Sequence, residues 1–148
     1  MFRDGLMTSV SIGHSVVSIG SRAFYNADQL TSVIIGDSVV DIGSFAFYSC
    51  GSLTSLTFGT SVVSIGSYAF KSCSSLAAVT LPDTVSTIGQ NGFYGCSALV
   101  SVQLGSSLTN SSLTAIGSGA FEGCVSLSIP IDLPDLVTSI GEHAFWNT

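Results

Sequence analysis

Hydrophobic and polar positions repeat along this chain with a period of 23 residues, which is much longer than the period of a helix or a strand. Residues 61–76, SVVSIGSYAFKSCSSL, nearly duplicate residues 38–53, SVVDIGSFAFYSCGSL. Inside each unit a short stretch alternates: Val33 and Ile35 are apolar in register, and Ser32 stands before Val33 as a polar neighbour. Such alternation predicts a short strand with one face toward a core.

Three columns of like residues run through the whole chain. The dipeptide Ile-Gly recurs at steps of 23, 23, 23, 28 and 24 residues, with its Ile at Ile19, Ile42, Ile65, Ile88, Ile116 and Ile140. A Phe follows each Ile five residues later, at Phe24, Phe47, Phe70, Phe93, Phe121 and Phe145. A small residue comes three positions after each Phe, at Ala27, Cys50, Cys73, Cys96, Cys124 and Thr148. One unit is too short to bury its own apolar face, whereas stacked copies bury a continuous core. The sequence therefore predicts a repeat solenoid, one domain over residues 1–148 with about six repeats and a buried Phe ladder.

Two irregular steps and two open ends modify this plan. The 28-residue step places an insertion near residues 106–112, which we expect to form a loop. The 24-residue step adds a residue near 128–134, where Pro130 cannot donate to a sheet ladder, so a bulged strand is expected. Neither end carries a polar cap, and Phe145 with Trp146 would lie at an open edge. Uncapped ends predict end-to-end association, capping by another chain, or continuation in a longer array.

The motif itself resembles a known class of repeat. The pattern L-x-x-V-x-L, then an extended segment such as SVVSIG, then xxAFxxC, resembles the leucine-rich repeat of the BspA-like class over roughly residues 7–148. The resemblance implies a right-handed, curved, β-rich coil with a parallel sheet on one face and short turns or 3-10 segments on the other. It also implies protein binding or adhesion at a cell surface or after secretion, and it brings no catalytic residues. We therefore expect a non-enzymatic protein-binding or adhesion module, and the alternative is a structural spacer or assembly subunit.

The first candidate surface is the outward face of the alternating segments. Each segment presents two outward positions, and the central ones are Ser32, Ile34, Ser55, Thr57, Ala78, Thr80, Ser101 and Gln103. Stacked strands would gather them into a small, neutral, hydroxyl-rich patch. The resemblance makes this sheet the usual binding face. The alternative is a solvated sheet of small residues without a ligand.

The second candidate surface is aromatic. The residue after each Phe and the residue two before it vary in polarity, so both columns are expected on an exposed flank of the coil. The aromatic members are Tyr25, Phe45, Tyr48, Tyr68, Tyr94 and Trp146. Aromatic clusters on a surface are typical of protein interfaces. The alternative is that each ring packs against its own coil.

Composition narrows the choice of partner. Only 8% of the residues are charged, the formal net charge is −6, and the bases are Arg3, Arg22 and Lys71. Proteins that bind nucleic acid or an anionic membrane surface do so through clustered Lys and Arg side chains. We therefore expect neither as a partner, and we expect a protein instead. Without a run of about 18 apolar residues, no membrane span is expected. The opening MFRDGLMTSV lacks the regions of a signal peptide, and the sequence does not decide the compartment.

Candidate chemistry is sparse. The four cysteines are 23 or 28 residues apart, unlike clustered zinc ligands, and share their column with Ala27, so reduced structural thiols are expected. His14 and His143 stand near opposite ends, so no nucleophile–His site is expected. We expect no catalytic residue, no metal and no cofactor. Asn110 opens an Asn-Ser-Ser triplet, which is a glycosylation signal only in a secreted eukaryotic chain.

Overall fold

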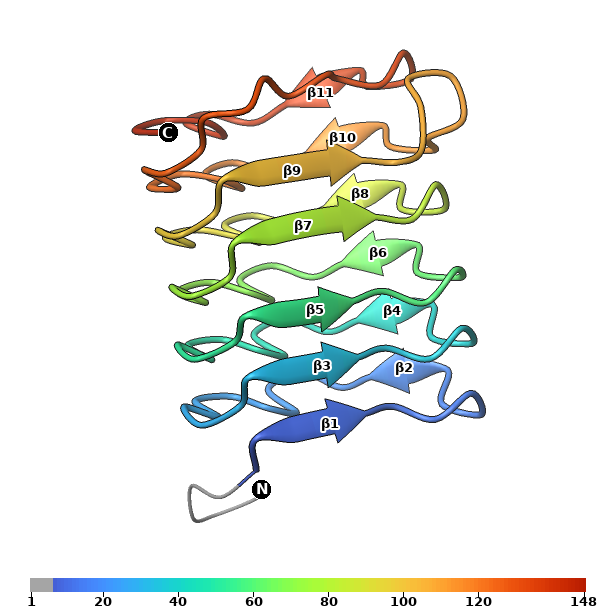
Figure 1. The fold of residues 1–148 in the computed structure, drawn as a ribbon. Coiled ribbons are helices and arrows are strands. Elements are labelled where there is room, and N and C mark those ends of the chain that lie inside the picture. Colours follow the sequence, from blue (N-terminus) through green and yellow to red (C-terminus); the bar gives the residue numbers. More distant parts are fainter. Residues whose placement is uncertain (1–6) are drawn as a thin grey trace.

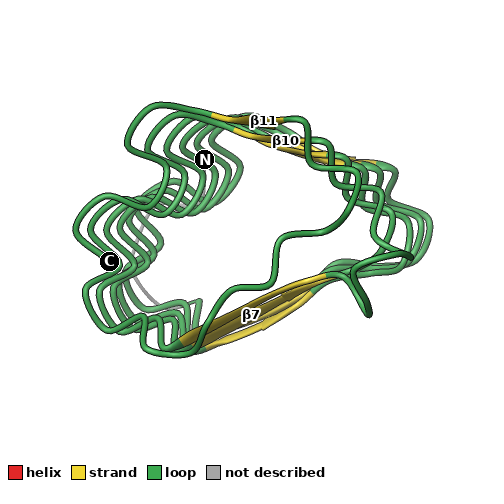
Figure 2. Ribbon diagram, turned by 90° about the horizontal axis from the view of Figure 1, so that it is seen from above, coloured by secondary structure: helices red, strands yellow, loops and turns green. Residues whose placement is uncertain are grey.

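The computed structural model describes residues 7–148, which form a right-handed solenoid of stacked coils (Figure 1). Each coil runs along a front strand, turns a corner, runs back through a shorter strand and returns through a flank of turns. The predicted β-rich solenoid is confirmed, and no helix occurs within residues 7–148. The structure differs from the expectation in one respect: a second parallel ladder lies behind the first, and the turns occupy the flank between them (Figure 2).

The front strands keep equivalent repeat positions side by side. They are β1 (Ser9–Ser11), β3 (Ser32–Ile34), β5 (Ser55–Thr57), β7 (Ala78–Leu81) and β9 (Ser101–Leu104). Ser32 pairs with Ser55 and Ala78 pairs with Ser101, all in parallel. The 23-residue spacing therefore fixes the register: one period of sequence is one coil.

The back strands form one parallel sheet of six. They are β2 (Ser18–Ile19), β4 (Asp41–Ile42), β6 (Ser64–Ile65), β8 (Thr87–Ile88), β10 (Ala115–Ile116) and β11 (Ser139–Ile140). Ile65 is buried, and Gly66 follows it where the backbone lies close to the preceding coil. A Cβ on Gly66 would lie 2.7 Å from the backbone nitrogen of Ser44 in the preceding coil. The Ile-Gly dipeptide recurs because the Ile fills the core, while the next position lies too close to the preceding coil for any side chain.

The front ladder, in contrast, is interrupted. β1, β3 and β5 form one sheet, and β7 with β9 forms another. At the corner after each front strand the coils touch: a Cβ on Gly36 would lie 2.6 Å from the carbonyl oxygen of Ile12, and one on Gly59 would overlap Gly36. The fourth coil carries Pro82 in this glycine column. Because the proline ring needs the space that Gly59 leaves empty, we attribute the separation of β5 from β7 to Pro82.

The sixth coil forms no front strand. Residues 128–134 have no strand structure, so the bulged strand expected near Pro130 is wrong. Figure 2 shows this segment running inward across the end of the coil stack, and Leu127 and Ile131 pack against the core. The inserted residues 106–112 form a loop at the corner, where the Leu108 carbonyl accepts a hydrogen bond from the Asp135 N–H at 3.0 Å.

A ladder of phenylalanines fills the centre, as the sequence predicts. The six rings stack nearly parallel, with centroids 5.0 Å apart for Phe24 and Phe47 and 5.4 Å apart for Phe121 and Phe145. The four inner rings are fully buried, and each buried Phe stabilises the fold by about 1.5–3 kcal/mol.

The four cysteines lie beside this ladder, free and buried. Each thiol donates to the carbonyl of the Phe in the coil before it, as Cys73 does to Phe47 at 3.2 Å. Burial raises the pKa of Cys124 to about 12, so this thiol stays protonated and unreactive at neutral pH.

Candidate functional site

The flank of turns owes its shape to two residues per coil with positive φ. The first column has φ between 53° and 63°, and its members are Arg22, Phe45, Tyr68, Asn91, Gly119 and His143. The second column has φ between 55° and 74°, and its members are Asn26, Ser49, Ser72, Gly95, Gly123 and Asn147. This left-handed conformation suits glycine and asparagine and disfavours bulky side chains. The second column follows that preference with small residues and asparagines, whereas the first does not.

The bent backbone also bonds each coil to the next one. The Phe45 N–H donates to the Ser67 carbonyl at 3.0 Å, and the Phe47 N–H donates to the Ala69 carbonyl at 2.7 Å. The flank is therefore a third hydrogen-bonded side of the solenoid, and it holds its side chains in fixed columns.

Aromatic and cationic side chains stack along the first column. The rings of Phe45 and Tyr68 lie 4.7 Å apart with an interplanar angle of 6°. The guanidinium of Arg22 lies 5.3 Å from the centre of the Phe45 ring. Such a cation–ring contact contributes about 0.5–1 kcal/mol at an exposed site.

The adjacent column continues the cluster. Tyr25 stacks on Tyr48 at 4.9 Å, and Phe45 joins the columns at 5.7 Å from Tyr48. The Lys71 ammonium lies 4.2 Å from the centre of the Tyr94 ring and 5.6 Å from that of Tyr68. We call the resulting surface the aromatic flank, and it consists of Arg22, Tyr25, Phe45, Tyr48, Tyr68, Lys71 and Tyr94.

The structure thus brings together five of the six aromatic residues that the sequence singled out. The sixth, Trp146, is 60% exposed and lies near His143, with Glu122 standing between it and Tyr94 in the column. The sequence-based selection omitted Arg22 and Lys71, although both occupy the same repeat positions as the rings. They are the only Lys and Arg side chains of residues 7–148, so both of these cations lie on this flank.

The front face consists mostly of small, uncharged side chains. Its eight selected residues point away from the core, and Ser32 and Ser101 are half-buried while the others are exposed. Ile34, 49% exposed, is its single large apolar side chain. The strand pairing beneath this face is interrupted between β5 and β7, so its residues stand on two sheets.

Other sequence candidates remain scattered. His14 lies 3.8 Å from Asp37, with both side chains exposed, and the Thr60 backbone N–H and hydroxyl donate to the Asp37 carboxylate at 3.1 and 3.5 Å, so this carboxylate connects its coil to the next one. Nowhere in that range do three His, Cys, Asp or Glu side chains gather as a metal site requires. The described part of the chain offers no helix able to span a bilayer. Asn110 is exposed in the inserted loop, where its N–H donates to the Ser107 hydroxyl.

Comparison with known proteins agrees with this geometry. The family model for the BspA-type leucine-rich repeat region (6 copies) matches residues 1–111 and 108–148. No curated protein matches the chain.

Among solved structures, a leucine-rich repeat protein of T. pallidum is similar, with a TM-score of 0.80 and 28% identity over 91% of this chain and 69% of that one. A leucine-rich repeat protein from Bacteroides ovatus has a TM-score of 0.75 and 33% identity over 93% of this chain and 37% of that one. A leucine-rich cell surface protein from Faecalibacterium prausnitzii has a TM-score of 0.63 and 33% identity over 89% and 38%. This chain therefore spans little more than a third of the last two proteins. On the family match and the fold, the chain belongs to the BspA-type leucine-rich repeat proteins.

Proposed function

We propose that this chain is a non-enzymatic protein-binding module and that the aromatic flank contacts the partner. One observation carries the proposal: Phe45 and Tyr68 adopt φ values of 60° and 62° at a position where other coils place Asn91 and Gly119. A bulky residue in this conformation costs about 1–2 kcal/mol. Because the same backbone is built with Asn or Gly elsewhere in the stack, the fold does not require the rings.

The chemistry of the flank suits protein recognition. Tyrosine, phenylalanine and arginine are enriched in protein interfaces, and rigid stacked rings lose little conformational entropy on binding. Tyr25, 43% exposed, offers a ring face and a hydroxyl at the rim of the cluster. The similar protein from Faecalibacterium prausnitzii is described as a cell surface protein, which supports an adhesive role for this module outside the cell.

The alternative function is a structural spacer or assembly subunit. The hydrogen-bonded ladders on the back and the flank favour it, because they make the coil stiff along its length. Tyr25 is exposed, whereas Phe45, Tyr48, Tyr68 and Tyr94 are half-buried against one another. A spacer needs the ladders but not the rings, so the two functions differ in what substitutions on the flank do.

The experiment replaces Phe45→Asn and Tyr68→Asn together. We expect the free energy of unfolding to change by no more than about 1 kcal/mol, because Asn tolerates positive φ and thereby offsets the lost stacking contacts. The proteins that the wild type captures from native extract, identified after cross-linking, should no longer be captured. The matched control is Ser55→Ala with Thr57→Ala on the front face, where both side chains are exposed, and it should keep the captured set. If the flank variant captures the same proteins as the wild type, the aromatic flank is not the binding surface, and the spacer function is favoured.

A further inference from the structure

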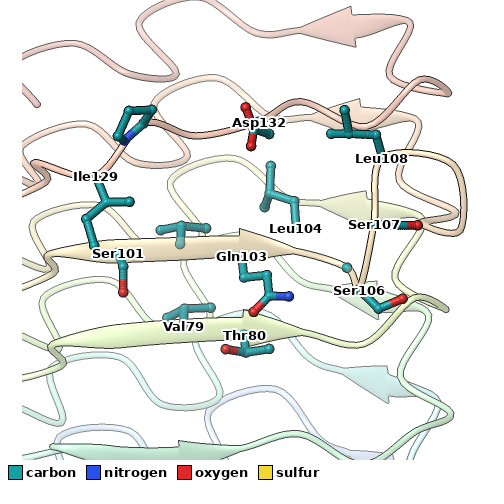
Figure 3. A pocket seen from close by; sticks show the side chains of 13 residues that line it. Val79, Thr80, Ser101, Gln103, Leu104, Ser106, Ser107, Leu108, Ile129 and Asp132 are labelled. Atoms are coloured by element: carbon teal, nitrogen blue, oxygen red, sulfur yellow. The ribbon is translucent and has the colours of Figure 1, made fainter.

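A groove opens on the front side between β9 and the sixth coil (Figure 3). It has a volume of about 420 Å³, and its walls include Val102, Leu104, Leu108, Ile129 and Asp132. The groove exists because residues 128–134 turn inward instead of forming the next front strand (Figure 2). The tie between Leu108 and Asp135 connects the inserted loop to the sixth coil at one end of the groove.

The backbone edge of β9 that faces this groove lacks partners. In a parallel ladder alternate residues bond to opposite neighbours. Ser101 and Gln103 pair with β7, so Val102 and Leu104 direct their backbone groups toward the sixth coil. Ser128 and Ile129 donate only to the Val100 carbonyl, at 3.3 and 3.4 Å, and within residues 7–148 no backbone bond from the sixth coil reaches Val102 or Leu104.

The same positions are satisfied elsewhere in the stack. Ile35 occupies the repeat position of Leu104, and its N–H donates to the Thr57 carbonyl in the next coil at 2.9 Å. The β9 edge therefore presents the N–H and carbonyl of Val102 and the N–H of Leu104 at the spacing of a strand. No neighbouring strand lies opposite these groups within residues 7–148. An open strand edge of this kind is a template for a further strand.

The walls of the groove indicate which side chains would suit a segment that pairs with β9. Ile129 is 54% exposed and Leu108 is 43% exposed, so two large apolar side chains stand at the rim without cover. Asp132 adds a carboxylate to a chain of net charge −6, and the two described bases, Arg22 and Lys71, lie in the aromatic flank, outside the lining of the groove. Because side chains alternate along a strand, the complementary segment alternates apolar residues with lysine or arginine.

We propose that this groove binds a short extended peptide segment with alternating apolar and basic side chains, which adds to the sheet as a strand along β9. Main-chain hydrogen bonds to Val102 and Leu104 hold the segment, its apolar side chains contact Leu108 and Ile129, and a basic side chain faces Asp132. Strand addition to an open edge is an established mode of peptide recognition. The proposal is independent of the aromatic flank, because the two surfaces share no residue.

The test uses the 148-residue chain and three blocked pentapeptides: Val-Lys-Val-Lys-Val, its Val-Glu-Val-Glu-Val counterpart, and the lysine peptide with two N-methylated backbone amides. The lysine peptide should bind saturably and slow hydrogen exchange at the Val102 and Leu104 amides. The methylated peptide should bind about tenfold more weakly, since it keeps the charge and loses the ladder bonds. In the free chain, the Leu104 amide should exchange faster than the Ile35 amide.

Asp132→Asn is the matched variant, because Asp132 is exposed, so the substitution should leave the fold intact. It should weaken the lysine peptide about two- to fivefold and leave the glutamate peptide no weaker than before. Equal binding of the methylated peptide, or unchanged exchange at Val102 and Leu104, would overturn the proposal. Concentration-dependent protection of both amides in the free chain would overturn it too, by showing that a second copy occupies the edge.

Discussion

The back sheet and the front sheet are built from the same repeats, yet only the back sheet runs unbroken through the stack. The back strands are two residues long and still pair from β2 to β11. The front strands reach four residues, and their ladder is interrupted after β5 and has no member in the sixth coil. Strand length and apolar content therefore do not decide whether a ladder continues.

The difference lies at the point of closest approach between coils. In every coil a glycine directly follows the back strand along the chain, from Gly20 to Gly141. In front, the equivalent glycine column is broken by Pro82, and the ladder separates there. We attribute the break after β5 to this replacement, because neighbouring strands must approach to about 4.8 Å and the proline ring occupies the space between them.

The largest expected effect comes from removing a side chain that supports both sheets. Phe70 is fully buried between Phe47 and Phe93, each at 5.1 Å, and the edge of Phe58 meets it from the front at 5.9 Å. Phe70→Ala should lower the free energy of unfolding by about 3–5 kcal/mol in denaturant melts. The control is Tyr68→Asn on the flank, which should cost less than about 1 kcal/mol. Equal losses would show that the two columns are not inside and outside as described.

The next effect concerns the back sheet alone. Gly66→Ala should destabilise the chain by about 1–3 kcal/mol, because the new Cβ meets the Ser44 backbone. Gly20→Ala is the matched control: it lies in the same column, a Cβ there has nothing within 4 Å, and the change should stay within about 0.5 kcal/mol. Equal melts for the two variants would mean that close approach does not explain the unbroken ladder.

A smaller effect is expected where the front sheet separates. Pro82→Gly should let β7 approach β5, so that the Phe58 amide becomes protected from hydrogen exchange as the Ile35 amide is. The free energy of unfolding should change by no more than about 1 kcal/mol, since glycine adds unfolded-state entropy while the new bonds stabilise. Gly59→Pro tests the converse and should separate β3 from β5. If the Phe58 amide of the Pro82→Gly variant still exchanges without protection, Pro82 is not the cause of the missing pairing between β5 and β7.

The smallest effect is a pH dependence at the front corner where β7 and β9 stay paired. The backbone N–H and the hydroxyl of Ser106 donate to the Asp83 carboxylate at 2.6 and 2.7 Å, which lowers the pKa of Asp83 below its ordinary 3.8. A lowered pKa in the folded state stabilises the fold above pH 3.8, and this contribution is lost as the pH falls through the folded-state value. Asp83→Asn should flatten the acid limb of the stability curve slightly. An unchanged acid limb would show that the carboxylate does not link these coils.

Much of the fold was readable in the sequence. The 23-residue period, the Phe ladder and the outward direction of Ser55 and Thr57 follow from local pattern, because a solenoid places each residue beside its own copy. The aromatic flank was partly readable as well: the columns predicted which rings gather, but not that Arg22 and Lys71 stack on them. Side-chain stacking depends on φ at Phe45 and Tyr68, and periodicity does not reveal those angles.

The sequence by itself determined the coil, its core and its register, since these depend on which residues recur and at what spacing. Only the tertiary structure decided where the ladders break. The second sheet, the gap beside Pro82 and the open edge of β9 depend on distances between backbones in different coils. One side chain at a contact, such as the ring of Pro82, is enough to hold two coils apart. The repeat pattern shows where such a residue stands but not how close the two backbones come.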